Sequence, residues 1–271
     1  MKEDFLRLAE MAGRLANIVC HYVVPIYQTQ QNRLTQVGTG FLVRSSAEHF
    51  LVTAAHVLDV GDASPLYFFC APSKLRSLAG SFRCTTFDQS RDDDLIDVAV
   101  IRLEGGAVPP YHEVEKYALD LDSLQPGRVR EGGAYLLVGF PSSMNKPTSH
   151  TTTLESKPWS VFGETLTDST YAFVGISPQT HLLMKFDQKR GFNADMSPRV
   201  MNMPQGMSGA PVWMIASEHY KDPKEGPVVV ALATRHKKSH KAIQGTDVGV
   251  VHEMIAEIMQ SLGEKSVGTR D

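Results

Sequence analysis

The sequence predicts an all-β fold with one helix at each end of the chain. Short runs rich in β-branched and aromatic residues recur between turn signals, as at residues 37–44 and 50–55. This pattern is typical of a β-sandwich or a β-barrel. Apolar residues recur at helical spacing over residues 3–16 and again over 251–262. A connector with paired glycines and prolines, residues 105–127, separates two groups of strands.

Three units are therefore expected along the chain. Residues 1–16 form an amphipathic helix, residues 17–118 a first β unit, and residues 119–271 a second β unit that ends in a helix. The first helix is expected to pack across the β units. A helix that docks a partner protein remains the alternative, because the same apolar stripe serves either role.

The individual strands follow from runs of apolar and β-branched residues. We expect strands over 18–27, 37–44, 50–55, 67–71, 81–87, 95–103, 134–140, 171–176, 181–186, 228–233 and 247–251. Residues 92–94 are interpreted as a solvated acidic loop, and residues 235–241 as a mobile basic loop.

Composition excludes several classes of function. The chain has 271 residues and a net charge of −3, so it lacks the basic field that nucleic acid would require. Cys20, Cys70 and Cys84 are odd in number and unpaired in spacing, which argues against a disulfide framework. No apolar run is long enough for a membrane span, and the N-terminus lacks a secretory apolar region. The cytoplasm is the expected location.

Metal ligands are not expected either. The pair His252-Glu253 begins a zinc-helix pattern, but Ala256 stands where the second histidine would be. His236 and His240 are four residues apart, but they lie in the basic run and not on a predicted helix. The sequence therefore predicts chemistry without a metal or another cofactor.

Three short motifs carry the candidate chemistry. His56 ends the run Leu-Val-Thr-Ala-Ala-His, Asp97 begins Asp-Val-Ala-Val, and Ser208 lies in Gly-Met-Ser-Gly-Ala-Pro. A serine hydroxyl becomes nucleophilic when a neutral imidazole takes its proton and a buried carboxylate orients that imidazole. The N–H groups of Gly206 and Ser208 are the candidate donors for the oxyanion that would form. Asp97 is preferred over its acidic neighbours because it alone lies in an apolar stretch.

The motifs resemble those of the chymotrypsin/trypsin-like serine peptidases, especially the bacterial branches without disulfides. Further matches are Gly-Thr-Gly-Phe at residues 38–41 and Leu-Val-Gly-Phe-Pro at residues 137–141. The order His, Asp, Ser along the chain fits this family and differs from subtilisin and from α/β-hydrolases. The resemblance spans about residues 18–262. It implies two six-stranded antiparallel β-barrels, with His56 and Asp97 in the first and Ser208 in the second.

The resemblance also suggests residues that line the substrate cleft. A serine at the position of Thr234 donates a hydrogen bond to the catalytic aspartate in the family, so Thr234 is a candidate for that role. An ordinary strand threonine is the alternative. Asn202, six residues before Ser208, matches the floor of the specificity pocket and predicts a neutral side chain there. Ala233 stands where glutamate-specific relatives place a histidine, so a preference for glutamate lacks its usual ligand here. Arg235 is a candidate for acidic groups elsewhere on the substrate.

Activation by a new N-terminal ammonium is excluded, because Met207 replaces the aspartate that receives it in digestive members of the family. The sequence thus predicts a serine endopeptidase that acts on protein or peptide substrates, gated by a partner protein or by loop ordering. One alternative is a peptidase fold that binds a partner and cuts nothing. Another is an esterase that acts through the same three residues.

Overall fold

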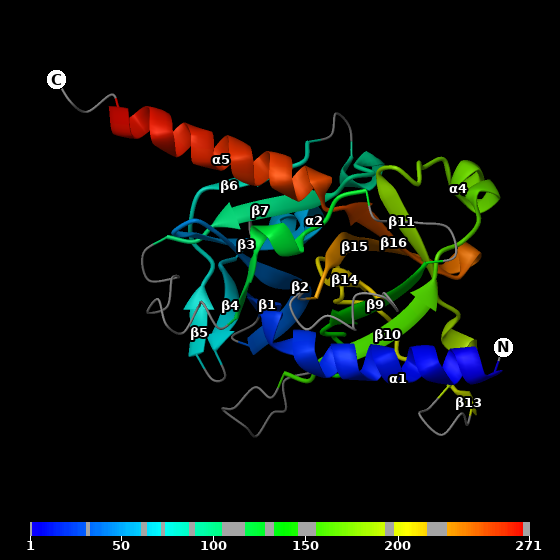
Figure 1. Ribbon diagram of the computed structural model, residues 1–271. Helices are drawn as coiled ribbons and strands as arrows, with labels where there is room; N and C mark the ends of the chain where they lie inside the picture. The colour runs from blue at the N-terminus through cyan, green and yellow to red at the C-terminus, as the bar shows by residue number, and fades with distance from the viewer. Residues whose placement is uncertain are drawn as a thin grey trace.

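The computed structural model describes residues 2–30, 33–60, 64–71, 74–86, 90–104, 117–127, 133–145, 156–192, 198–215 and 227–267. Two β-sheets with mostly antiparallel pairing form the body of the molecule, and a long helix lies along each of two opposite sides (Figure 1). The first sheet is built from residues before 121 and the second from residues after 133. The chain therefore completes one sheet before it begins the other.

The first sheet has eight strands. They are β1 (Val23–Gln30), β2 (Arg33–Ser45), β3 (Glu48–Ala54), β4 (Leu66–Ala71), β5 (Lys74–Ser77), β6 (Phe82–Cys84), β7 (Val98–Arg102) and β8 (Ala118–Asp120). The order is β5-β4-β1-β2-β3-β7-β6, and β8 pairs with β2 in parallel. The long strand β2 is central, because it pairs with three others.

The second sheet has six strands. They are β9 (Ala134–Gly139), β10 (Trp159–Glu164), β11 (His181–Lys185), β14 (Pro211–Met214), β15 (Val229–Lys237) and β16 (Ala242–Asp247). Their order is β10-β9-β14-β15-β16-β11, and an isolated bridge between Thr165 and Met184 joins the two edges. The small strands β12 (Gly191–Phe192) and β13 (Pro198–Arg199) pair with each other.

These sheets meet the expected fold class in part. The chain is mostly β with helices at both ends, as predicted, and the second sheet has the expected six strands. The first sheet has eight strands instead of six, because β5 extends one edge and β8 adds in parallel to β2. The expected boundary between residues 118 and 119 falls inside β8, which belongs to the first sheet.

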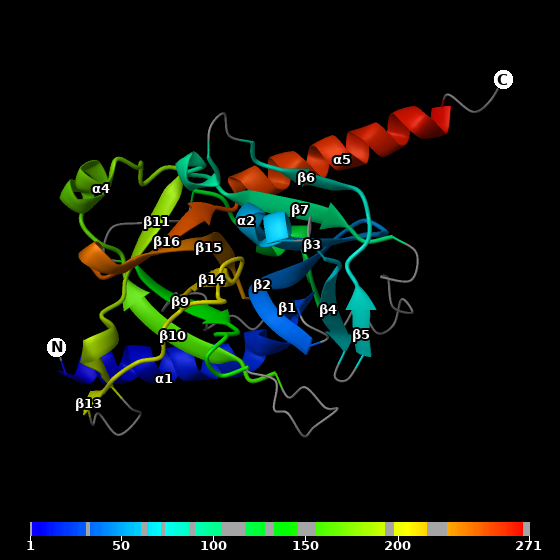
Figure 2. The same ribbon diagram turned by 180° about the vertical axis from the view of Figure 1, so that it is seen from behind.

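The two terminal helices cross from one sheet to the other. Helix α1 (Lys2–Val19) precedes the first sheet but packs against β9 and β10 of the second. Helix α5 (Gly249–Val267) follows the second sheet but packs against β6 and β7 of the first. Figures 1 and 2 show them on opposite sides of the molecule. Each helix therefore joins the two halves of the chain.

The largest hydrophobic cluster lies between these layers. It includes Leu15 of α1, Phe41 and Val52 of the first sheet, Trp213 of the second sheet and Ile255 of α5. All of these side chains are at most 1% exposed. Burial of apolar surface is the dominant favourable contribution to folding, so this shared core holds the two sheets in a fixed relation.

Three predicted strands are wrong in whole or in part; of the one predicted over residues 18–27, residues 23–27 do lie in β1. Residues 18 and 19 continue helix α1, because Val19 faces the core beside Leu15 at helical spacing. The segment at 171–176 belongs to helix α4 (Asp168–Val174), which Gly175 ends with a left-handed φ of 78°. Residues 247–251 are the end of β16 and the start of α5. In each case tertiary packing or a helix-ending glycine outweighs the strand propensity of β-branched residues.

Among the described residues, no helix is long and apolar enough to cross a lipid bilayer.

The packing of α1 can be tested with two leucines of the same helix. Leu15 is fully buried, whereas Leu6 is 38% exposed. We expect Leu15→Ala to lower the free energy of unfolding by about 2–5 kcal/mol, because it leaves a cavity in the shared core. Leu6→Ala serves as the control and should cost about 1 kcal/mol or less. Urea unfolding followed by circular dichroism measures both. Equal effects would contradict the assignment of α1 as part of the core.

Candidate functional site

Each of the three motif residues lies just before or just after a strand, outside the hydrogen-bonded sheets. His56 is the second residue of helix α2 (Ala55–Asp59), which directly follows β3. Asp97 directly precedes β7, the neighbour of β3. Ser208 lies in the turn before β14 of the second sheet. The site therefore forms where the two sheets meet.

Close backbone contacts bring the serine turn to the histidine strand. The N–H of Thr39 donates to the carbonyl of Ser208 at 2.9 Å. A Cβ atom on Gly209 would lie 2.0 Å from the Thr39 oxygen and 2.9 Å from the Ala54 nitrogen, two residues before His56. Only glycine fits this approach, and its φ of +89° is also in the left-handed region. The required glycine thus places Ser208 beside the start of α2.

His56 and Asp97 are joined by two hydrogen bonds. The His56 Nδ1 atom lies 2.7 Å from Asp97 Oδ2, and the backbone N–H of His56 donates to Asp97 Oδ1 at 2.9 Å. Asp97 is 1% exposed, while the His56 side chain is 36% exposed. The buried carboxylate accepts from Nδ1–H, which leaves Nε2 as the free acceptor on the imidazole. This is the tautomer that a general base requires.

Asp97 has an unusual backbone, and Asp94 holds it. Its φ of +53° lies in the left-handed region, which costs a residue with a side chain about 1–2 kcal/mol. Asp94 Oδ1 accepts from the backbone N–H groups of Ile96 and Asp97, while its Oδ2 accepts from Arg91 and Thr85. Asp94 is 5% exposed. The prediction of a solvated acidic loop is therefore wrong for Asp94, which is buried and structural.

The second sheet also binds this loop, here called the Asp97 loop and defined as residues 91–97. The guanidinium of Arg235, on β15, donates to the carbonyls of Arg91, Asp92 and Asp94 at 2.6–2.9 Å. His181 of β11 donates through Nε2 to the carbonyl of Leu95 at 3.0 Å, and burial lowers the pKa of this imidazole. The Asp97 loop is thus held from both sheets.

The serine turn presents two unpaired backbone N–H groups. Met207 N–H donates to the Pro204 carbonyl and Gly209 N–H to the Ala233 carbonyl. Within the part of the chain that the structure describes, no acceptor pairs with the N–H groups of Gly206 or Ser208. Gly206 has a φ of +88°, and a Cβ there would meet Ser142 N at 2.8 Å. The N–H groups of Gly206 and Ser208, two residues apart in this turn, are therefore available to bind an oxyanion.

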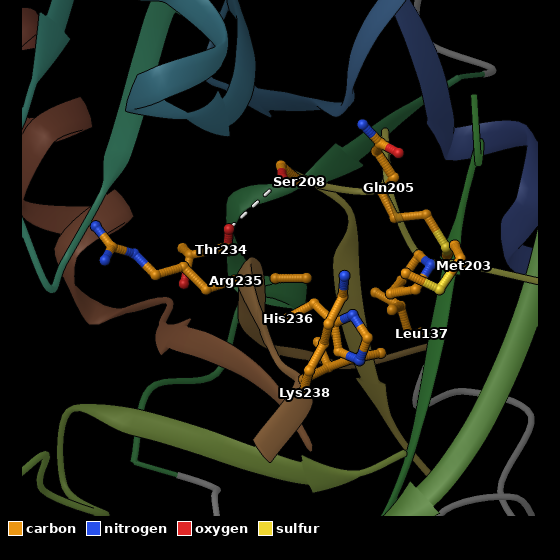
Figure 3. Close-up of a pocket in the computed structure, with 12 residues that line it drawn as sticks. Leu137, Met203, Gln205, Ser208, Thr234, Arg235, His236 and Lys238 are labelled. Atoms are coloured by element: carbon orange, nitrogen blue, oxygen red, sulfur yellow. Dashed lines mark hydrogen bonds between the residues drawn. The ribbon is translucent and has the colours of Figure 1, made fainter. Parts of the chain in front are cut away.

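The Ser208 hydroxyl points toward the second sheet. Its Oγ lies 3.5 Å from the Thr234 carbonyl, a long and weak contact (Figure 3). Among the described residues no hydrogen bond joins Ser208 to His56. Catalytic hydrogen bonds are often long or misaligned before substrate binds. In this structure the Ser208 hydroxyl is therefore oriented toward the Thr234 carbonyl.

A pocket of about 280 Å³ opens beside Ser208 (Figure 3). One wall comes from residues 203–208 and the other from β15 and the turn after it, while β9 and β16 contribute side chains between them. Its lining residues are Leu137, Met203, Pro204, Gln205, Met207, Ser208, Ala233, Thr234, Arg235, His236, Lys238 and Ile243.

The structure places three predicted cleft residues differently from their expected roles. Asn202 does not line this pocket, and its Nδ2 lies 3.0 Å from Met144 Sδ. Thr234 lines the pocket, but its hydroxyl donates to the Gln244 carbonyl at 3.4 Å and not to Asp97. Both Asp97 oxygens bind His56 instead. Arg235 also lines the pocket, although its guanidinium is bound to carbonyls of the Asp97 loop.

Sequence reasoning missed Asp94 and Lys238. An aspartate that accepts hydrogen bonds from the N–H groups two and three residues later forms a recognisable Asx-turn. The role of Asp94 could therefore have been predicted from the sequence. Lys238 was assigned to a mobile loop, but the basic run 235–241 continues β15 and turns back into β16. The long-range contacts of Arg235 and His181 leave no local signal in the sequence.

In the described segments, no three His, Cys, Asp or Glu side chains gather as a metal site.

Comparison with known proteins places the chain in a family. The model of the trypsin-like peptidase domain matches residues 38–218, more than half of the chain, so the protein belongs to that family. This match confirms the resemblance seen in the motifs. None of the curated proteins compared with the chain matches it.

A solved structure supports the fold. A thermostable serine protease, AL20, from an extremophilic microorganism is similar with a TM-score of 0.51 and 14% identity, over 86% of this chain and 92% of that one. At this identity the likeness shows the fold alone.

The close approach of the serine turn to the first sheet predicts the effect of adding one methyl group. Gly209→Ala should lower the free energy of unfolding by roughly 2–5 kcal/mol, because the new Cβ meets the Thr39 carbonyl and the backbone is left-handed. Gly175→Ala is the matched control: φ there is +78°, but no described atom lies within 4 Å. It should cost only about 1–2 kcal/mol. Chemical unfolding compares the two, and equal losses would contradict the contact.

Proposed function

We propose that the protein is a serine endopeptidase that cleaves protein or peptide substrates through an acyl-enzyme. Ser208 is the nucleophile, His56 the general base and then acid, and Asp97 the orienting carboxylate. The observation that carries this proposal is the pair of hydrogen bonds from His56 to the buried Asp97. Such a pair fixes the imidazole with Nε2 free, which an incidental surface histidine would not need.

The reaction would proceed in two stages. The Ser208 oxygen attacks the scissile carbonyl as His56 Nε2 takes the hydroxyl proton, and the N–H groups of Gly206 and Ser208 bind the oxyanion. His56 then gives its proton to the leaving amine. Water enters and is deprotonated by His56, attacks the ester, and releases the second product from Ser208. Asp97 stays ionised and stabilises the imidazolium.

Gating by a partner or by loop ordering is part of this proposal. Met207 is 1% exposed and packs in the apolar cluster of the second sheet. A buried methionine offers no carboxylate to a new ammonium, so that route of activation is closed. The N–H groups of Gly206 and Ser208 already lack acceptors among the described residues. Control would therefore act on the Ser208 side chain or on access to the pocket.

One observation favours a second candidate, a binding module without catalysis. The Ser208 hydroxyl contacts the Thr234 carbonyl rather than His56. If this orientation persists with substrate, the fold would hold a peptide in the pocket and leave it intact.

Labelling with a fluorophosphonate, which reacts with activated serines, separates the two functions. Wild-type protein should label, and Ser208→Ala should not. Asp97→Asn should label at least about a hundredfold more slowly, because the wrong tautomer of His56 then faces the serine.

Ser239→Ala is the control for specificity. The Ser239 hydroxyl lies 2.9 Å from His240 Nδ1 on the surface, so it forms a serine–histidine contact without a buried carboxylate. This variant should label at the wild-type rate. Equal labelling of Ser208→Ala would exclude the proposed peptidase. Absence of labelling in the wild-type protein would exclude a peptidase that is active without a partner.

A further inference from the structure

The pocket beside Ser208 is lined by both apolar and positively charged side chains. Three of its lining residues are basic or carry an imidazole: Arg235, His236 and Lys238. None of the twelve described lining residues is an aspartate or a glutamate. The others include six apolar side chains, from Leu137, Met203, Pro204, Met207, Ala233 and Ile243.

Lys238 is the cation available to a ligand. The guanidinium of Arg235 is already bound to three carbonyls of the Asp97 loop. The Lys238 side chain, by contrast, forms no hydrogen bond or ion pair within the described part of the chain. Figure 3 shows its nitrogen extended into the pocket between Arg235 and Met203. Lys238 is an exposed residue at the rim of the pocket, and an ammonium without an anion is a natural partner for a carboxylate.

His236 lies beside Lys238 and adds a second polar group. Its ring packs edge-on against Phe186, with the ring centroids 5.3 Å apart. Burial and the nearby Lys238 charge lower the pKa of this imidazole. Both residues line the same pocket, so an anion placed there would be attracted to the Lys238 charge. In its neutral form His236 still has one N–H to donate.

We propose that the pocket receives an acidic side chain, aspartate or glutamate, from the residue whose carbonyl Ser208 attacks. Lys238 forms the ion pair with the carboxylate, His236 donates a second hydrogen bond, and the methylene groups lie against Leu137 and Met203. This inference rests on the proposed peptidase function. It replaces the neutral preference predicted from Asn202, which does not line the pocket.

The same charges exclude the opposite specificity. A lysine or arginine side chain would bring a third positive group next to Lys238 and Arg235, with no carboxylate among the described lining residues to pair with it. A neutral side chain of similar shape, such as glutamine, would fill the pocket but would form no ion-paired hydrogen bond with Lys238. Discrimination between glutamate and glutamine therefore measures the role of Lys238 directly.

A binding assay on Ser208→Ala protein tests this without depending on turnover. Three fluorescein-labelled alanine peptides, identical except for a last residue of glutamate, glutamine or leucine, are titrated by fluorescence polarisation. Their common terminal carboxylate cancels in the comparison. We expect the peptide ending in glutamate to bind roughly tenfold or more tightly than that ending in glutamine, as a charged hydrogen bond predicts.

Two lysine variants in the same background assign the effect. Lys238→Met keeps the length of the side chain, removes its charge, and should abolish the preference for glutamate. Lys237→Met removes the same charge one residue earlier, at a position that does not line the pocket. It should retain the preference. Circular dichroism confirms that each variant is folded.

The outcomes separate this inference from the proposed function. Equal binding of the glutamate and glutamine peptides, binding of neither, or a preference that survives in Lys238→Met overturns the acidic pocket. The fluorophosphonate probe carries no amino-acid side chain that could enter the pocket. Its reaction with the wild-type protein therefore reports on Ser208 alone. A protein that labels but shows no acidic preference keeps the peptidase function and loses this specificity. A protein that prefers glutamate but does not label keeps the pocket and is a binding module.

Discussion

The arrangement of the site depends on the Asp97 loop and its hydrogen bonds to both sheets. Asp97 adopts a left-handed backbone that a residue with a side chain rarely takes. Asp94 compensates for this from within the loop, while Arg235 and His181 bind its carbonyls from the second sheet. Each of these hydrogen bonds pairs a backbone group that would otherwise have no partner within the protein. Because the loop holds the carboxylate and the carboxylate holds His56, a change in this network would displace the His56 imidazole.

The same network links the pocket to the chemistry. Arg235 and Lys238 lie three residues apart on β15 and the turn that follows it. Arg235 binds the Asp97 loop, and Lys238 extends into the pocket. Strand β15 further supplies the Thr234 carbonyl that the Ser208 hydroxyl contacts. Strand β15 therefore contributes both to the pocket and to the hydrogen bonds that hold the Asp97 loop.

The sequence predicts the local parts of this site and misses the parts that depend on folding. His56, Asp97 and Ser208 lie in short motifs, and the structure brings His56 and Asp97 into contact. The glycines beside Ser208 have positive φ values, as a tight turn requires. The pairing of Arg235 with a loop more than 140 residues away has no local signature. The sequence predicts a strand over part of residues 168–174, where the structure has a helix. The strand propensity of these residues is weak, and tertiary packing outweighs it.

The most direct test of the account is the proton between His56 Nδ1 and Asp97, observed by NMR. A short hydrogen bond to a buried carboxylate should place this signal downfield of the backbone amides, and Asp97→Ala should abolish it. Arg235→Ala removes three hydrogen bonds to the Asp97 loop and leaves both partners in place. The account predicts that the signal broadens or disappears in this variant. A sharp, unshifted signal in Arg235→Ala, or no such signal in the wild-type protein, would contradict it.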